Sequence, residues 1–309
     1  MKRQSRRVHY FLSITGYILL FLGVAAPSAW AQETSGTFLS IPVDVVGAGM
    51  GGADVARFSH GISPFANPAG SQVTSSTATL THELWLAEQR VNALSIQMPL
   101  QKGRSGLALT GRMVNHASVP RFDASGNRMG SLEPQDLSLG AAYAMRFGML
   151  SLGAGAQYIQ ENLEVAKGTG FSFDLGALLD VGPARIGVSG TNLFGYLNYD
   201  GSSYDPPRRL ATGVAVSPGL HDVELVAQYN DRRYGDKDLA LGAQWSGMHG
   251  ILNLRAGYVA LTESSEQASF SPLRFGFTIA HSGLALDYAY VPHKELGQAH
   301  LLSLRWMKQ

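Results

Sequence analysis

The chain has 309 residues, of which 45% are hydrophobic and 15% are charged, and its formal net charge is +1. A balance this close to neutral gives no indication of a nucleic-acid partner. Cysteine is absent, which excludes a disulfide framework and a thiolate metal site, so packing and hydrogen bonds must stabilise the fold.

Residues 1–31 have the pattern of a secretory signal peptide. Basic residues from Lys2 to Arg7 precede an apolar run, and Ala29–Ala31 supplies the small-x-small pattern of a cleavage site. The alternative, a membrane anchor helix, needs about 20 apolar residues, and this run is shorter. We therefore expect export and cleavage after Ala31, which removes the basic residues and leaves a mature net charge of −3.

Residues 32–74 show no regular alternation, and we expect them to form a plug inside or beneath the domain that follows. Their motif residues are Gly47, Gly49, Gly51, Gly52, Asn67, Pro68 and Gly70. The stretch Gly47–Gly52 matches the G-x-G-x-x-G pattern of dinucleotide-binding folds through Gly47, Gly49 and Gly52. However, Pro64 interrupts any helix that follows, and no acidic residue stands about twenty positions further on. The glycines therefore indicate tight, close-packed backbone rather than a nucleotide site.

Residues 75–309 alternate between apolar and small or polar positions, which is the signature of β-strands. Fourteen strands are expected, most about ten residues long, as a tilted strand needs to cross a bilayer. They cover residues 75–86, 91–100, 104–114, 135–147, 149–160, 171–180, 184–194, 208–217, 221–230, 238–246, 250–260, 272–280, 283–291 and 298–307. No apolar stretch after the signal segment is long enough for a membrane helix, so a closed barrel is the remaining way to span a membrane.

The faces opposite the apolar rows carry charged side chains. These residues are Arg112, Arg146, Asp174, Arg185, Glu224, Arg255, Arg274 and Asp287. A charge facing lipid at mid-depth costs about 2–4 kcal/mol, so we expect these side chains to face the lumen and to pair with one another. Arg274 and Asp287 lie on neighbouring strands and are predicted to meet across the hairpin.

The connections between the strands are alternately tight and long, which an up-and-down barrel with two unlike sides produces. A secreted β-sandwich, the soluble alternative, gives no reason for this alternation. The sequence therefore predicts an all-β fold, a 14-stranded antiparallel transmembrane β-barrel with an N-terminal plug, whose short turns face the periplasm. The longest external connection, residues 115–134, is expected to be a loop. It is the leading candidate surface for contact with a partner, and a solvated loop without a partner explains it equally well.

Motifs of catalysis are lacking in the sequence. The histidines show no H-E-x-x-H or other paired spacing for a metal, and no G-x-S-x-G nucleophile motif is present. A catalytic triad assembled from distant residues would leave no sequence signal. We expect a protein that is not an enzyme and that needs no cofactor.

Several short stretches resemble one family of bacterial outer-membrane proteins. They are Phe38–Pro42, Gly47–Ala53, Asn67–Gly70, Asp174–Gly176, Gly190–Gly195 and Asp205–Pro207. Together they resemble the PorV/PorQ family, which belongs with the FadL-like outer-membrane barrels of fourteen strands. The opening Phe38–Pro42 and the modest length of the chain are nearer to PorQ.

The resemblance implies a non-enzymatic scaffold or anchor in the type IX secretion system, which exports proteins and attaches them to the cell surface. The partners implied are the lipid bilayer and other secretion-system outer-membrane or surface proteins. FadL relatives instead pass hydrophobic molecules through the barrel wall, with the N-terminal plug as a gate. Because the Asn67–Gly70 stretch is shared with both groups, a transporter that takes a hydrophobic ligand or lipid stays open as the alternative.

Overall fold

The structure is a computed structural model, and it describes residues 35–58, 63–163, 166–219, 222–233, 237–263, 271–293 and 296–308. The expected signal peptide, 1–31, with its cleavage after Ala31, lies outside these residues. Among the helices of the described chain, none is long and apolar enough to cross a membrane.

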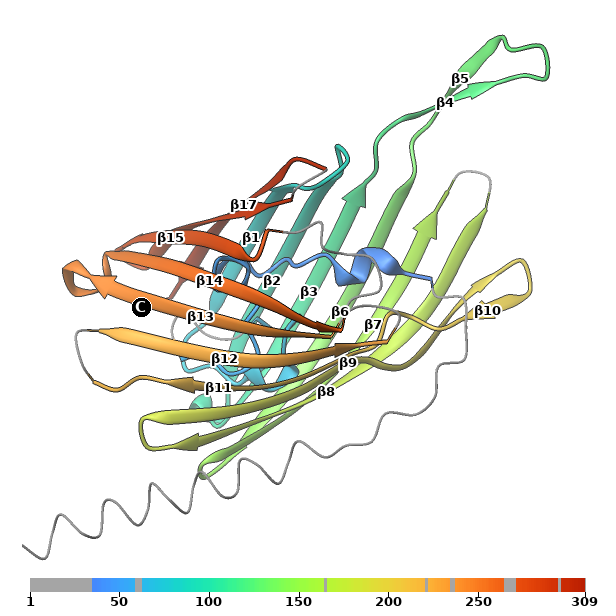
Figure 1. Ribbon diagram of the computed structural model, residues 1–309. Helices are drawn as coiled ribbons and strands as arrows, with labels where there is room; N and C mark the ends of the chain where they lie inside the picture. The colour runs from blue at the N-terminus through green and yellow to red at the C-terminus, as the bar shows by residue number, and fades with distance from the viewer. Residues whose placement is uncertain are drawn as a thin grey trace, which may run out of the picture. The chain divides into compact units, whose positions relative to one another are not determined.

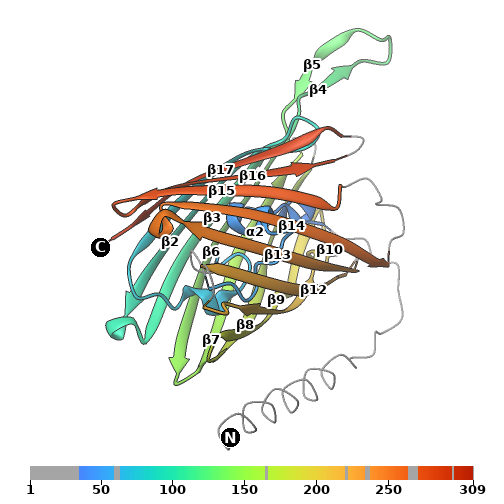
Figure 2. The ribbon, with the colours of Figure 1, turned by 60° about the vertical axis from the view of Figure 1, so that its left-hand side comes forward.

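Fourteen antiparallel strands of the described chain form a closed barrel (Figure 1 and Figure 2). Each strand pairs with the next along the ring, and the pairings β17–β1 and β8–β9 complete the closure. The strands are β1 (Thr77–Leu84), β2 (Arg90–Leu100), β3 (Ser105–Asn115), β6 (Gln135–Phe147), β7 (Leu150–Asn162), β8 (Lys167–Val181), β9 (Ala184–Tyr199), β11 (Arg209–Val216), β12 (Val223–Arg232), β13 (Lys237–Gly247), β14 (Leu252–Glu263), β15 (Leu273–His281), β16 (Leu284–Pro292) and β17 (Gln298–Met307). The predicted fold class is confirmed.

Two strands extend further than the sequence predicts. β8 begins at Lys167 instead of 171, and β9 continues to Tyr199 instead of ending at 194. The added end of β9 pairs with the short strand β10 (Ser202–Tyr204). The ladder between them is irregular near Asp174, and Asn192 takes a left-handed conformation with φ of 53°. The Asp174 carboxylate accepts a hydrogen bond from the Asn192 backbone N–H at 2.6 Å, which stabilises this bulge.

The strand β17 shows how the barrel wall separates two environments. Leu302, Leu304 and Trp306 point outward and are 45%, 52% and 48% exposed. The alternate residues Ser303 and Arg305 point inward and are buried. Apolar side chains outside and polar side chains inside reverse the arrangement of a soluble barrel, so this wall is built to face lipid.

The described part of the N-terminal segment, 35–58 and 63–74, runs through the interior of the barrel (Figure 2). It contains the helical turns η2 (Thr37–Ser40) and η3 (Pro68–Ser71) and the short helix α2 (Val45–Gly49). Asp44 caps α2 by accepting from the Gly47 N–H, and Asn67 caps η3 by accepting from the Ala69 N–H. Two further helical turns, η4 (Gln101–Gly103) and η5 (Met248–Gly250), connect strands of the wall.

The connection 115–134 contains regular structure that the sequence pattern does not predict. It forms a separate two-stranded hairpin of β4 (Val119–Phe122) and β5 (Arg128–Leu132). Figure 1 shows this hairpin extending well beyond the ends of β3 and β6. The Asn127 N–H donates to the Asp123 carboxylate at 2.8 Å, a local turn bond that alternation patterns do not show.

Candidate functional site

The inner wall touches the N-terminal segment through glycines, which we call the wall glycines. They are Gly106, Gly153, Gly176, Gly187, Gly213, Gly242, Gly257 and Gly276. A Cβ on Gly257 would lie 2.0 Å from the Gly51 nitrogen, and one on Gly153 would lie 2.3 Å from the Ala69 nitrogen. Backbone atoms cannot move aside as a flexible side chain can. The wall glycines therefore let the segment lie directly against eight strands.

The predicted motif glycines lie along this contact. Gly49 faces Gly276 of β15, while Gly51 and Gly52, with φ of 78° and 85°, turn the chain after α2. A Cβ on Gly47 would come within 2.7 Å of the Asp54 Cβ. The remaining motif residues lie on the other side of the lumen, where Asn67 and Pro68 pack on Gly176 and the Gly70 carbonyl accepts from Gln97.

Wall side chains satisfy the backbone of the segment where it has no regular structure. The side-chain carbonyl of Gln228 accepts from the N–H groups of Asp54 and Val55, both at 2.8 Å, and its amide donates to the Gly52 carbonyl at 2.9 Å. The Glu224 carboxylate accepts from the Phe58 N–H at 2.6 Å. Without these partners, buried backbone groups would be left without hydrogen bonds.

Asn67 joins both halves of the segment to the wall. Its side-chain amide donates to the Val55 carbonyl at 3.1 Å and to the carbonyls of Ala177 and Val188 at 3.4 Å. The same side chain accepts from the Ala69 N–H at 3.0 Å, and Asn67 is fully buried. One side chain thus holds β8, β9 and two separate stretches of the segment.

The predicted lumen charges lie on the inward positions of their strands. Most of them bond to groups outside this set rather than to one another. Arg112 donates to the Phe38 and Leu39 carbonyls at 3.1 and 2.7 Å. Arg185 donates to the Arg57 carbonyl at 2.9 Å. Arg146 and Arg185 both pair with Asp180, which the charge pattern did not single out. The expectation of mutual pairing is therefore wrong for these residues.

Asp287 forms a buried cluster with β17 and β14. It lies 3.1 Å from Arg305 and 3.9 Å from Arg255. The predicted meeting with Arg274 is wrong, because the register places Thr278 opposite Asp287 and Arg274 four residues further along β15. At about 3.3 Å per residue, that separation is too large for an ion pair.

Two ion pairs within the lumen were missed by the sequence. Asp44 lies 2.6 Å from Arg57 within the segment, and Asp54 lies 2.6 Å from Arg209 of β11. Burial raises the pKa of the Asp44 carboxyl, although Arg57 opposes the shift. Burial alone would also raise the pKa of Asp54, but Arg209 and the hydrogen bond from Gln228 lower it below its ordinary value.

This lowered pKa predicts a pH dependence. An aspartate in an unfolded chain titrates near pH 3.9, so Asp54 contributes its full stability above about pH 4 and loses it as the pH falls through its lower folded pKa. We expect Asp54→Asn to lower the urea midpoint of the folded barrel at pH 7 and to lower it less at pH 3. Equal losses at both pH values would show that the charge of Asp54 does not matter.

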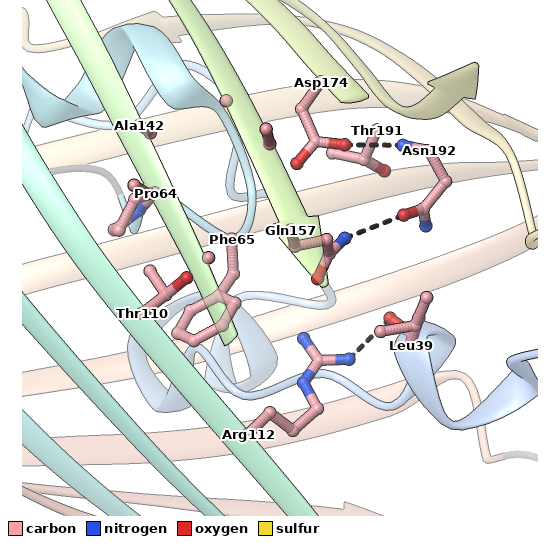
Figure 3. A pocket seen from close by; sticks show the side chains of 14 residues that line it. Leu39, Pro64, Phe65, Thr110, Arg112, Ala142, Gln157, Asp174, Thr191 and Asn192 are labelled. Atoms are coloured by element: carbon pink, nitrogen blue, oxygen red, sulfur yellow. Dashed lines mark hydrogen bonds between the residues drawn. The ribbon is translucent and has the colours of Figure 1, made fainter. Parts of the chain in front are cut away.

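A polar cavity of about 40 Å³ lies beside the segment in the lumen (Figure 3). Arg112, Gln157, Asp174 and Asn192 face it, and the Arg112 Nε is buried there without a hydrogen-bond partner. This space can hold a few water molecules, whereas a cavity that binds benzene measures about 150 Å³. The cavity is thus too small and too polar for an aromatic ligand.

Arg112→Met tests the attachment of η2. The change removes two hydrogen bonds from a charged donor, each contributing about 1.5–3 kcal/mol, so we expect a clearly lower urea midpoint for the barrel in lipid vesicles. Arg146→Met is the matched control, because its side chain is 38% exposed and bonds Gly148 and Asp180 rather than the segment. Equal midpoints for the two variants would contradict this role of Arg112.

An apolar groove of about 470 Å³ lies on the outward face of β11–β15. Its floor includes the small residues Ala227, Ala243 and Ala256, and larger side chains such as Leu241 and Tyr258 border it. The groove also reaches the wall glycines Gly242 and Gly257, whose inner faces touch Met50 and Gly51. The wall is therefore thin between the lipid side and the end of α2.

The described residues include no group of three or more His, Asp or Glu that could hold a metal ion. A search of protein-family models finds no match, and a search of curated protein sequences finds none either. Solved structures do match. A Pseudomonas aeruginosa FadL homologue is 12% identical with a TM-score of 0.61, and the match covers 86% of this chain and 98% of that one. The chain has the FadL-like barrel fold.

Two further structures share this FadL-like fold. The Ralstonia pickettii toluene transporter TbuX is 12% identical, with a TM-score of 0.57 and coverage of 91% of this chain and 100% of that one. The Pseudomonas putida toluene transporter TodX is 12% identical, with a TM-score of 0.59 and coverage of 85% and 97%. At this identity the likeness concerns the fold.

Proposed function

We propose that this chain is a non-enzymatic outer-membrane barrel that passes hydrophobic small molecules and uses its N-terminal segment as the gate. In this proposal residues 1–31 are an export signal cleaved after Ala31, residues 32–74 are the plug, and residues 75–309 form the barrel. The shared fold of two toluene transporters supports this function. The wall glycines support the assignment of a plug, because they allow the segment to fill the lumen.

The observation that carries the proposal is the outward apolar groove. A hydrophobic compound dissolved in the membrane can pack by van der Waals contact in this groove, over small residues such as Ala243 and Ala256. On the other side of this thin wall lies Met50 of the plug. Because the described lumen cavity is only about 40 Å³, passage requires the plug to move away from the wall.

A second function, a scaffold or anchor in type IX secretion, is favoured by a different observation. The plug is bonded or packed against the wall on many strands, through Asn67, Gln228, Arg112 and the wall glycines. A barrel whose lumen stays filled suits a protein that binds partners on its surface better than one through which molecules pass. The PorV/PorQ resemblance of the plug sequence supports the same function.

A disulfide between plug and wall separates the two functions. A Cβ on Gly213 would lie 2.7 Å from a γ-carbon of Val55, which places cysteines at these positions within bonding reach. The chain lacks cysteine, so Val55→Cys with Gly213→Cys can form one specific bond. For a gated transporter we expect toluene uptake into cells to fall to background when the bond is oxidised and to return after reduction.

The single variants Val55→Cys and Gly213→Cys control for the substitutions themselves, and neither should respond to oxidation. Uptake that is the same with the bond formed and reduced would contradict a moving plug. For the scaffold, the locked protein should still restore surface attachment of secreted proteins in cells that lack the natural chain. Failure of the locked protein to restore it, while the reduced protein succeeds, would count against the scaffold.

A further inference from the structure

The hairpin of β4 and β5 is separate from the barrel wall, and its position is informative. Both views show it extending past the strand ends, away from the ring (Figure 1 and Figure 2). Ten residues separate Asn115, the last residue of β3, from Gly126 in the turn, which allows a reach of about 30 Å. The lipid headgroup layer is only about 5–8 Å thick on each side. The tip of the hairpin therefore extends beyond the lipid headgroups.

The hairpin is built as an ordered element at both of its ends. At the tip, the Asp123 carboxylate accepts from the backbone N–H groups of Ser125 and Asn127, both at 2.8 Å, and from the Asn127 side chain at 3.0 Å. At the base, His116 Nε2 lies 2.6 Å from Asp136 Oδ2. An ordered surface loses less conformational entropy when it binds a partner.

Apolar side chains on this hairpin are exposed. Val119, Phe122 and Met129 are 50%, 61% and 62% exposed, although they lie outside the band that faces lipid. An isolated two-stranded hairpin is at best marginally stable in water, and exposed aromatic and methionine side chains are typical of binding surfaces. Such an element gains stability when a partner covers it.

The charges on the hairpin indicate the character of that partner. Arg121 and Arg128 are exposed along the two strands, whereas the acidic side chains lie at the ends of the hairpin, Asp123 hydrogen-bonded within the turn and Glu133 at the base. Because adjacent residues of a strand point to opposite faces, Phe122 lies with Arg128 on one face of the hairpin and Val119 lies with Arg121 on the other. Each face therefore presents an apolar and a cationic side chain. Pro120 has no N–H and weakens the outer edge of β4 for strand addition, so recognition by side chains fits better than addition of another strand.

We propose that the β4–β5 hairpin is a docking site for an extracellular protein whose contact surface is apolar and acidic. Phe122 and Met129 are the apolar anchors, and Arg121 and Arg128 pair with the partner's carboxylates. The reach of the hairpin beyond the headgroups favours a protein over lipid. This inference does not depend on whether the barrel transports or serves as a scaffold.

The test places a benzophenone amino acid at Phe122 or at Met129 in the full chain, in the native cells, followed by irradiation and mass spectrometry. Leu296, an exposed residue of the β16–β17 connection, is the matched control position. We expect one and the same surface protein at 122 and 129, none at 296, and loss of the product with Arg121→Glu and Arg128→Glu. The purified partner should bind the charge-reversed barrel at least tenfold more weakly.

Heat-modifiable gel migration shows that each variant still folds as a barrel, so loss of the product is not a folding failure. Three results would overturn the proposal. The first is that no adduct forms at 122 or 129 in correctly folded protein. The second is that the adduct is lipopolysaccharide, which would make the hairpin a lipid-binding element. The third is that charge reversal leaves both the adduct and the affinity unchanged.

Discussion

Alanine in place of Gly153 should loosen the plug, while alanine in place of Gly155 should not. Both glycines lie on the inner face of β7, two residues apart. A Cβ at 153 would lie 2.3 Å from the Ala69 nitrogen, whereas the nearest atom to a Cβ at 155 is 3.4 Å away. Because the atoms met at 153 are backbone, either the plug or the strand must shift, at a cost of about 1–3 kcal/mol or more.

The urea midpoint of the barrel in lipid vesicles measures this difference. Gly155→Ala is expected to be neutral or slightly stabilising, since glycine within a strand is destabilising by roughly 0.5–1 kcal/mol relative to alanine. Gly153→Ala should lower the midpoint and increase protease cleavage within residues 35–74. Equal midpoints for the two variants would show that the plug does not lie against β7 in the membrane.

Among substitutions that barely change the size of a side chain, Asn67→Asp should be the most damaging to stability. The fully buried amide donates to three carbonyls, and a carboxylate can donate to none of them. The introduced carboxylate would be buried against these carbonyl oxygens without a cation from the described residues to pair with, so we expect a loss of several kcal/mol at pH 7. The loss should be visible as a lower temperature of heat-modifiable migration.

Acid provides the internal control for this variant. At low pH the introduced carboxyl gains a proton and can donate one hydrogen bond, so part of the lost stability should return. A variant that is as stable as the natural chain at pH 7 would contradict the role of Asn67 as the residue that joins β8, β9 and the plug. An equal loss at all pH values would assign the damage to something other than the missing donor.

The barrel could be predicted because lipid and lumen make opposite demands on successive residues. Along β17 burial alternates from Ala299 to Trp306, and from Leu302 onward the outward residues are apolar and the inward ones polar. The predicted range 298–307 agrees with the strand. Where glycines interrupt the pattern the prediction failed. Gly168 and Gly170 of β8 were read as loop, but they make room for the Tyr199 ring and the Tyr196 carbonyl of β9.

The site was less predictable, because its contacts join residues far apart in the chain. Glycine content alone cannot distinguish Gly153, which meets Ala69, from Gly155, which faces the polar cavity. The pair of Asp54 and Arg209 likewise depends on how the plug enters the lumen. The alternation did place the charged side chains on inward positions, but their partners are mostly carbonyls of the plug, which a charge pattern does not reveal.

The central claim is that residues 35–58 and 63–74 lie packed inside the lumen, and chemical access to Ala48 tests it most directly. Ala48 in α2 is 1% exposed, whereas Ser125 at the hairpin tip is exposed. In the cysteine-free chain, Ala48→Cys should resist a membrane-impermeant maleimide from both sides of the outer membrane, while Ser125→Cys reacts fully on intact cells. Equally rapid labelling of both cysteines would contradict the claim, because it would show a lumen open to water.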